Sequence, residues 1–219
     1  MTAILKVDTI QDTSGNNIIN DNSNTITIGA SGDTISIPSG ATIANSGTAT
    51  GFGIDGITMA DQFCLTSSAS GSLTPISSNL SRVARTGQGT LNGGMTESSG
   101  IFTFPSTGIY LVTFTASFQL NADSRYIFIN ILATTDNSNY STITETPTFI
   151  QQTSSTTYAQ AQCSSLVDVT NTSNVKVKFH VGPDNSSVTT RGEATSATYM
   201  QFIRLGDTWW QIKNIYIML

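Results

Sequence analysis

The sequence contains little of what most catalytic and metal sites are built from: two cysteines, one histidine, and charged residues that make up only 11% of its 219 positions. Cys64 and Cys163 lie far apart and match no metal-ligand spacing, so we expect two buried free thiols. Because His180 is the only histidine, one chain cannot form a multi-histidine metal site or a histidine-based relay. We expect His180 to be a solvated surface residue, and we expect no metal ion and no cofactor.

Catalytic motifs are equally scarce. A glycosidase needs two carboxylates that flank the scissile bond, and no spacing of the acidic residues supports such a pair. The sequence has no GxSxG nucleophile motif. Residues 51–56 match GxGxxG, but no strand-to-helix context surrounds them, so we interpret them as a glycine hinge. We therefore predict that the protein is not an enzyme, and we assign no catalytic residue.

The charge and hydrophobicity of the chain disfavour two kinds of partner. A net charge of −5 is unsuited to nucleic acid or to an anionic membrane surface, which both require a basic face. No apolar run approaches the ~20 residues that a membrane-spanning helix needs. The first residues, MTAILKVDTIQD, lack a basic segment followed by an apolar stretch, so we expect no secretory signal.

Polar β-forming and turn-forming residues dominate instead. Serine, threonine and asparagine account for 79 of the 219 residues, and glycine for 18 more. Threonine favours strands, whereas glycine, asparagine and serine favour turns, so the composition predicts an all-β protein. From residue 61 onward we expect about ten strands, arranged as an antiparallel jelly-roll β-sandwich. The clearest strands are expected at 109–120, 125–133, 157–169, 175–181 and 197–205.

The composition changes near residue 60, and residues 1–60 contain a short internal repeat. Thr25-Ile26-Thr27-Ile28 recurs as Thr34-Ile35-Ser36-Ile37, and a weaker copy begins at Thr42. Each copy predicts a short strand with isoleucine on one face, which buries too little surface to be stable in one chain. We therefore predict a three-chain β-shaft, with a flexible tether as the alternative. The isoleucines expected on its axis are Ile26, Ile28, Ile35, Ile37 and Ile43.

Two of the expected strands are apolar on both faces. The segment 126–132 reads YIFINIL, and 199–203 reads YMQFI. In a sandwich the outer face of such a strand would meet water unless another subunit covered it, so both segments predict an oligomer. The candidates for this interface are Tyr126, Phe128, Tyr199 and Phe202.

Residues 61–207 resemble the trimeric jelly-roll heads of the complement and tumour-necrosis-factor type. The resemblance lies in FTFPSTGIYLVTFTASF at 102–118, VKVKFHVGPDN at 175–185 and ATYMQFIRLGD at 197–207. The matching positions in the first of these stretches are Phe102, Pro105, Gly108, Tyr110 and Phe114. The resemblance implies a homotrimer and is poor between residues 135 and 165.

Residues 5–43 are similar to the amino-terminal segments of many marine bacteriophage virion proteins, which often precede such a head. That family forms trimers that serve as tail fibres, tail-associated appendages or head decorations. The resemblance implies a structural, non-enzymatic protein of tail-fibre type, located in the virion. Its partners would be other virion proteins and a host-surface glycan or protein. A capsid decoration (cement) protein is the alternative, and a polysaccharide depolymerase or soluble lectin is less favoured.

The last segment, 208–219, continues beyond the expected end of the head as an apolar strand. We expect it to pack under its own trimer, or alternatively to dock into a neighbouring virion protein. Its docking candidates are Trp209, Trp210, Tyr216 and Leu219. Loops at 121–123, 136–140 and 184–190 are candidates for contact with a ligand. Two of these loops contain oxygen-rich stretches, 136–139 and 184–185, of a kind that can bind Ca²⁺. We favour ordinary turns at both stretches.

Overall fold

The computed structural model describes residues 9–11, 13–15, 17–22, 25–28, 31–38, 41, 57–82, 86–92, 94–193 and 195–208. The chain divides into two compact units, Met1–Phe52 and Gly53–Leu219. The second unit, which we call the head, includes strand β4 (Met59–Leu65). That strand begins two residues before the predicted start of the head at residue 61.

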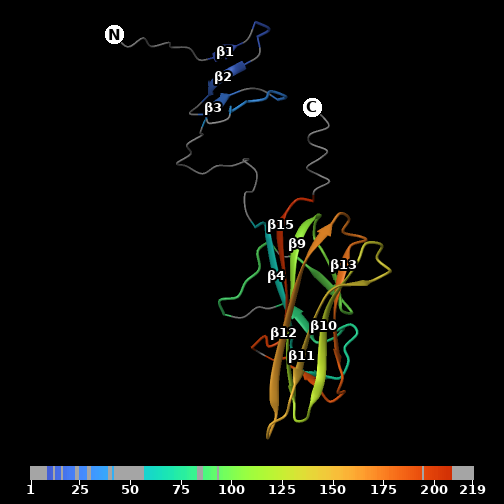
Figure 1. The fold of residues 1–219 in the computed structure, drawn as a ribbon. Helices are drawn as coiled ribbons and strands as arrows, with labels where there is room; N and C mark the ends of the chain where they lie inside the picture. Colours follow the sequence, from blue (N-terminus) through green and yellow to red (C-terminus); the bar gives the residue numbers. More distant parts are fainter. Residues whose placement is uncertain are drawn as a thin grey trace. The chain divides into compact units, whose positions relative to one another are not determined.

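The first unit contains a small antiparallel sheet, in which β2 (Asn17–Asn22) lies between β1 (Thr9–Gln11) and β3 (Thr25–Ile28) (Figure 1). Ile19 pairs with Ile10 on one side and with Ile28 on the other, so three isoleucines form a row, and all three are exposed. Strand β3 is the predicted first copy of the repeat. The second copy forms no strand in the single chain, since residues 33–38 are described without one, and such short copies were expected to need neighbouring chains. The three-chain shaft stays a prediction.

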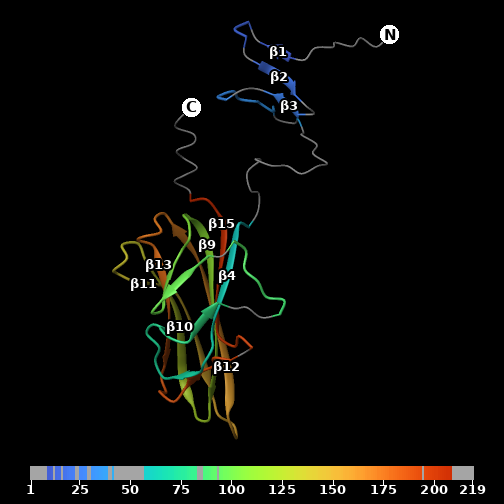
Figure 2. The same cartoon turned by 180° about the vertical axis from the view of Figure 1, so that it is seen from behind.

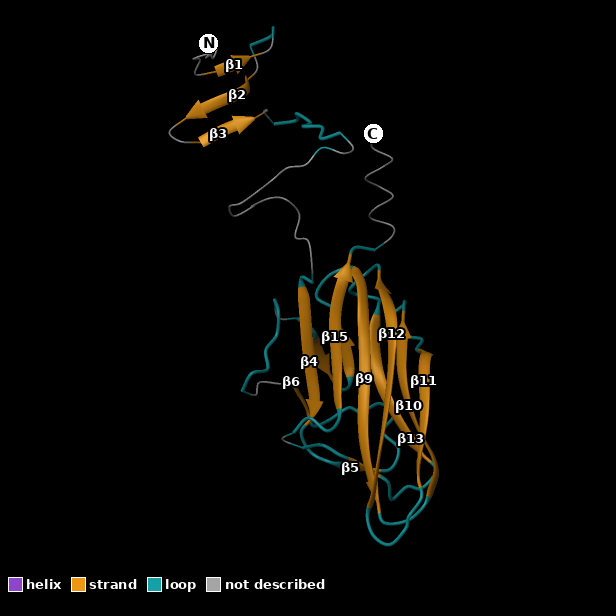
Figure 3. Cartoon of the chain, turned by 60° about the vertical axis from the view of Figure 1, so that its left-hand side comes forward, coloured by secondary structure: helices purple, strands orange, loops and turns teal. Residues whose placement is uncertain are grey.

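The head consists of two antiparallel sheets, and its described residues contain no helix (Figure 3). The five-stranded sheet has the order β11 (Ser141–Ile150), β10 (Ser124–Thr134), β13 (Lys176–Pro183), β8 (Ile101–Thr103) and β7 (Thr96–Ser98). The seven-stranded sheet has the order β5 (Ala69–Ser70), β14 (Thr189–Thr190), β9 (Gly108–Leu120), β15 (Tyr199–Gly206), β4 and β6 (Leu80–Arg82). Strands β14 and β15 pair with different parts of β9, and β12 (Thr157–Val169) pairs with β9 along its whole length. In the part of the chain that is described, no helix is long and apolar enough to cross a membrane.

The connections between the sheets are those of a jelly roll. From β8 the chain crosses to β9 in the other sheet and back to β10, and from β11 it crosses to β12 and back to β13 (Figures 1 and 2). The pairs β9–β12 and β10–β13 thus join strands that are distant in sequence. The predicted all-β jelly-roll sandwich is confirmed, and the five clearest predicted strands correspond to β9, β10, β12, β13 and β15.

The core lies between the sheets, because the inward residues of their long strands are apolar at every second position. Phe102 stands at its centre, with its ring 5.2 Å from Phe63, 5.3 Å from Phe179 and 5.2 Å from Phe202. Each buried phenylalanine stabilises the fold by about 1.5–3 kcal/mol through its transfer from water. Phe202 is completely buried within its own chain, so its proposed place in a subunit interface is wrong.

One ion pair reaches into this core. The Asp61 side chain on β4 is fully buried, and Arg82 on β6 donates to its carboxylate through Nε at 2.9 Å and Nη2 at 3.0 Å. Met95 N–H donates to the same carboxylate at 2.9 Å, and Arg82 donates to Met95 O at 2.5 Å. The pair therefore joins β4, β6 and the segment before β7. The Asp61 carboxylate raises the pKa of Arg82.

Candidate interaction surfaces of the head

The outer face of the seven-stranded sheet carries a continuous apolar row. Leu166 on β12 pairs with Leu111 on β9, Leu111 pairs with Ile203 on β15, and Ile203 pairs with Ala60 on β4. Ala60 in turn forms a bridge with Leu91. The strand residues of this row point away from the core, because the residues on both sides of Leu111 and Ala60 are buried, as are Phe202 beside Ile203 and Val167 beside Leu166. Leu166 is 63% exposed and Leu91 is 43% exposed, so the row presents apolar surface to the outside.

Neutral polar side chains surround this apolar row. Gln201 Nε2 donates to Gln62 Oε1 at 2.7 Å, and Gln162 Nε2 donates to Thr115 Oγ1 at 3.0 Å. A shallow hollow of about 390 Å³ is lined by Thr115, Gln160, Ala161, Gln162 and Tyr199. Among the outward residues of strands β4, β9, β12 and β15, all of which are described, Asp168 is the only charged one. Low charge with apolar side chains at the centre is typical of a surface that another subunit covers.

The chain enters and leaves the head at one end of this sheet. Met59 at the start of β4 pairs with Arg204 near the end of β15. Strand β9 begins at the same end and is 13 residues long, which corresponds to about 40 Å. Near its other end, Gln119 pairs with Thr189. The head therefore has a connecting end and, about 40 Å away, a loop end.

Two of the three predicted contact loops meet at the loop end. Asn185 Nδ2 donates to Asp123 O at 3.0 Å, which joins the loop 184–190 to the loop 121–123. A hollow of about 410 Å³ is lined there by Gln119, Leu120, Asn121, Ala122, Thr156, Asn185, Ser187 and Thr189. Amide and hydroxyl groups of this kind can exchange hydrogen bonds with a polar, uncharged ligand. The third loop, 136–140, follows the opposite end of β10 and so lies away from the other two.

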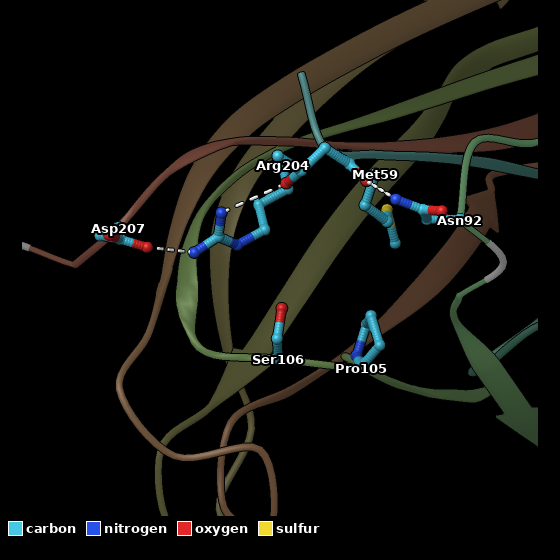
Figure 4. Close-up of a pocket in the computed structure, with 7 residues that line it drawn as sticks. Met59, Asn92, Pro105, Ser106, Arg204 and Asp207 are labelled. Carbon is cyan, nitrogen blue, oxygen red and sulfur yellow. Dashed lines mark hydrogen bonds and ion pairs between the residues drawn. The ribbon is translucent and has the colours of Figure 1, made fainter. Parts of the chain in front are cut away.

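A third hollow, of about 440 Å³, lies at the connecting end and is shown in Figure 4. Arg204 crosses it: its Nε donates to Thr107 O at 3.1 Å, its Nη1 donates to Thr58 Oγ1 at 3.3 Å, and its Nη2 is paired with Asp207. Asn92 Nδ2 also donates to Thr58 O at 3.0 Å. The polar groups of this hollow thus bind one another, and they fix the start of β4 to the end of β15.

The two oxygen-rich stretches form turns, as favoured. The Asp136 carboxylate accepts hydrogen bonds from Ser138 N at 2.9 Å, from Asn139 N at 2.7 Å and from Thr134 Oγ1 at 2.8 Å. The hydrogen bond from the side-chain amide of Asn139, together with these three, holds the pKa of Asp136 well below its usual range. Asp184 instead pairs with Arg125 at 2.8 Å. No group of three or more potential metal ligands of the His, Cys, Asp and Glu types occurs among the described residues.

The predicted interface residues of the head do not share one surface. Tyr126 and Phe128 lie 5.0 Å apart, ring centre to ring centre, on the outer face of the five-stranded sheet. Tyr199 lies on the outer face of the seven-stranded sheet, in the hollow beside Thr115. The residues that complete this second surface, Leu111 and Leu166, were not singled out from the sequence. In the sequence, each of these two is only an apolar residue at a position that faces outward. That they share one surface follows from the strand register.

Other predicted site residues lie in the first unit or outside the described residues. Ile26, Ile28, Ile35 and Ile37 are all exposed, with exposed fractions between 47% and 69%. Ile43 and the docking candidates Trp209, Trp210, Tyr216 and Leu219 lie outside the described residues. Both cysteines are buried and neither is in a disulfide, as predicted. His180 lies on the outer face of its strand beside Lys178, as predicted, but it is half-buried and its Nε2 is shielded from solvent.

The sequence matches no protein-family model and no curated protein. Among solved structures, the chain is similar to the crystal structure of murine APRIL at pH 8.5, with a TM-score of 0.47 and 13% identity over 67% of this chain and 98% of that one. The crystal structure of murine APRIL at pH 5.0 gives a TM-score of 0.48 and 12% identity over the same shares. At this identity the likeness concerns the arrangement of strands alone, and the jelly-roll assignment rests on the sheet order above.

Proposed function

We propose that this protein is a non-enzymatic structural protein of a bacteriophage virion, a homotrimeric appendage of the tail-fibre type. Its amino-terminal unit anchors it to other virion proteins, and its head presents loops to a host-surface glycan or protein. The observation that carries the proposal is the two-ended geometry of the head. The chain enters and leaves at one end, and the two contact loops meet about 40 Å away at the other.

The trimer in this proposal forms through the outer face of the seven-stranded sheet. That face has the apolar row at its centre and neutral amides around it, and its one charged outward residue, Asp168, lies at an end of β12. Three heads joined in this way would place three copies of the loop end near one another. Weak contacts would then be multiplied by avidity.

The amino-terminal segment supports the assignment to a virion. Its similarity to marine bacteriophage virion proteins covers residues 5–43. The exposed row of Ile10, Ile19 and Ile28 is apolar surface that a neighbouring chain or virion protein would cover.

Gold-labelled antibodies against the head, applied to purified virions, test this function. The proposal expects label on the tail. Label on the capsid shell would replace it with a decoration protein, and virions without any label would refute a virion role. Incubation of the purified protein with host polysaccharide provides the catalytic control: a fall in chain length would contradict the non-enzymatic assignment.

A further inference from the structure

Three basic side chains follow one another on the outer face of the five-stranded sheet. Lys176, Lys178 and His180 occupy alternate positions of β13, and the residues between them, Val177 and Phe179, are completely buried in the core. The three therefore share the outward face, at a spacing of two residues or about 6.6 Å. We call these three residues the basic row.

The basic row has no acidic partner among the described residues. The four described arginines each form an ion pair, with Asp61, Asp184, Glu193 and Asp207. Lys176 Nζ instead donates to Thr103 Oγ1 at 3.0 Å, and Lys178 Nζ lies 4.2 Å from the centre of the Tyr140 ring.

The residues opposite the basic row on β10 are also uncharged. Lys176 pairs with Thr134, Lys178 pairs with Leu132, and His180 pairs with Asn130. Two acids lie nearby in other elements. Glu145 on β11 is two strands away and accepts a hydrogen bond from Asn130, and the Asp136 carboxylate is occupied by its own loop. The positive charge of the row is therefore not neutralised locally.

Two polar atoms at this place are buried without a hydrogen-bond partner: Tyr140 Oη and His180 Nε2. Such atoms are rare in native proteins, because burial without a partner costs about 1–3 kcal/mol. Burial raises the pKa of Tyr140. Burial, and to a smaller extent the charge of Lys178, lowers the pKa of His180. Both shifts follow from burial, which disfavours the charged form of each group.

The geometry points to a binding site for an acidic sugar, whose carboxylate lies against the basic row and whose hydroxyl groups meet the neutral polar side chains beside it. Lys178 and Lys176 supply the positive charge, and His180 Nε2 and Tyr140 Oη can donate hydrogen bonds once the flexible Lys178 stem moves aside. Asn130 and Thr103 are the neutral neighbours. A chain of net charge −5 repels extended polyanions, so a short acidic sugar suits the site better than a nucleic acid does.

This inference goes beyond the proposed function, on which it rests only for its biological role: the basic row begins opposite Thr134, at the end of β10 that lies away from the two contact loops. The site remains accessible in the proposed trimer, since self-association there uses the other sheet.

Because His180 is the only histidine, its imidazole NMR signal in the full-length protein reports on the site without ambiguity. Titration with trigalacturonate, with maltotriose as the neutral control, is expected to shift this signal saturably and to raise the pKa of His180. Lys178→Gln should weaken binding about tenfold, as the loss of one charge-assisted hydrogen bond. Lys176→Gln tests the second lysine of the row in the same titration. Arg125→Gln removes an exposed cation on another element, so this variant should bind trigalacturonate like the wild type.

An unchanged His180 signal at saturating trigalacturonate would overturn the inference. So would an equal response to maltotriose, or an equal loss of affinity in Arg125→Gln. None of these results bears on the location of the protein in the virion, so failure here and failure of the proposed function are distinguishable.

Discussion

Replacement of Leu166 by aspartate tests whether the outer face of the seven-stranded sheet holds the trimer together. Leu166 is 63% exposed in the single chain, so the substitution leaves the core intact. Complete burial of a leucine is worth about 1.5–3 kcal/mol, and the exposed part that a partner can still cover accounts for about 1–2 kcal/mol of this. Three copies per trimer give about 3–6 kcal/mol, or a dissociation constant raised by about 10²–10⁴-fold.

Sedimentation over a dilution series measures this effect. Phe149→Asp is the matched control, because Phe149 is 64% exposed and lies on β11 of the other sheet. We expect Leu166→Asp to dissociate at concentrations where the wild type and Phe149→Asp stay trimeric. The reasoning is refuted if Leu166→Asp stays associated, or if Phe149→Asp dissociates equally.

Three further predictions concern the head. Asp61→Asn should lower the free energy of unfolding, measured by urea denaturation, by about 2–3 kcal/mol. The buried Met95 N–H loses a charged acceptor, whereas the Arg82 side chain is 43% exposed and can be hydrated by water instead. A loss below about 1 kcal/mol would contradict this. His180 has a lowered pKa in the folded protein, so the unfolded chain binds a proton at this residue more tightly. The free energy of unfolding should therefore fall as the pH drops below the unfolded value of about 6.5. His180→Gln should reduce this dependence of stability on pH. Burial raises the pKa of Cys163 to about 12, so iodoacetamide should label it only after unfolding; rapid labelling of the native protein would contradict its burial.

The alternation of residues made the long central strands predictable. In β9 and β13 every second residue is apolar and buried, and polar residues face outward along β13 and along the second half of β9, so the period of two was visible in the sequence. Strand β11 was missed for the opposite reason. Its inward residues are Thr144, Thr146 and Thr148, and it contains Pro147, which a sheet tolerates at an edge.

The surfaces were harder to predict, because they depend on which strands become neighbours. Leu111 and Leu166 are 55 positions apart in sequence and become one row only through the β9–β12 register. His180 is half-buried beside Tyr140 and Lys178, and Tyr140 comes from a loop 40 residues earlier. Alternation alone separates Tyr199 from Phe202: three residues apart on one strand, they point to opposite faces.

The native mass of the purified full-length protein tests the central claim most directly. Light scattering or native mass spectrometry should give a mass near three times 23.2 kDa, because the proposed trimer covers the apolar row of the seven-stranded sheet. A stable monomer at 23.2 kDa, with the apolar row left open to water, would contradict both the trimer and the proposed appendage.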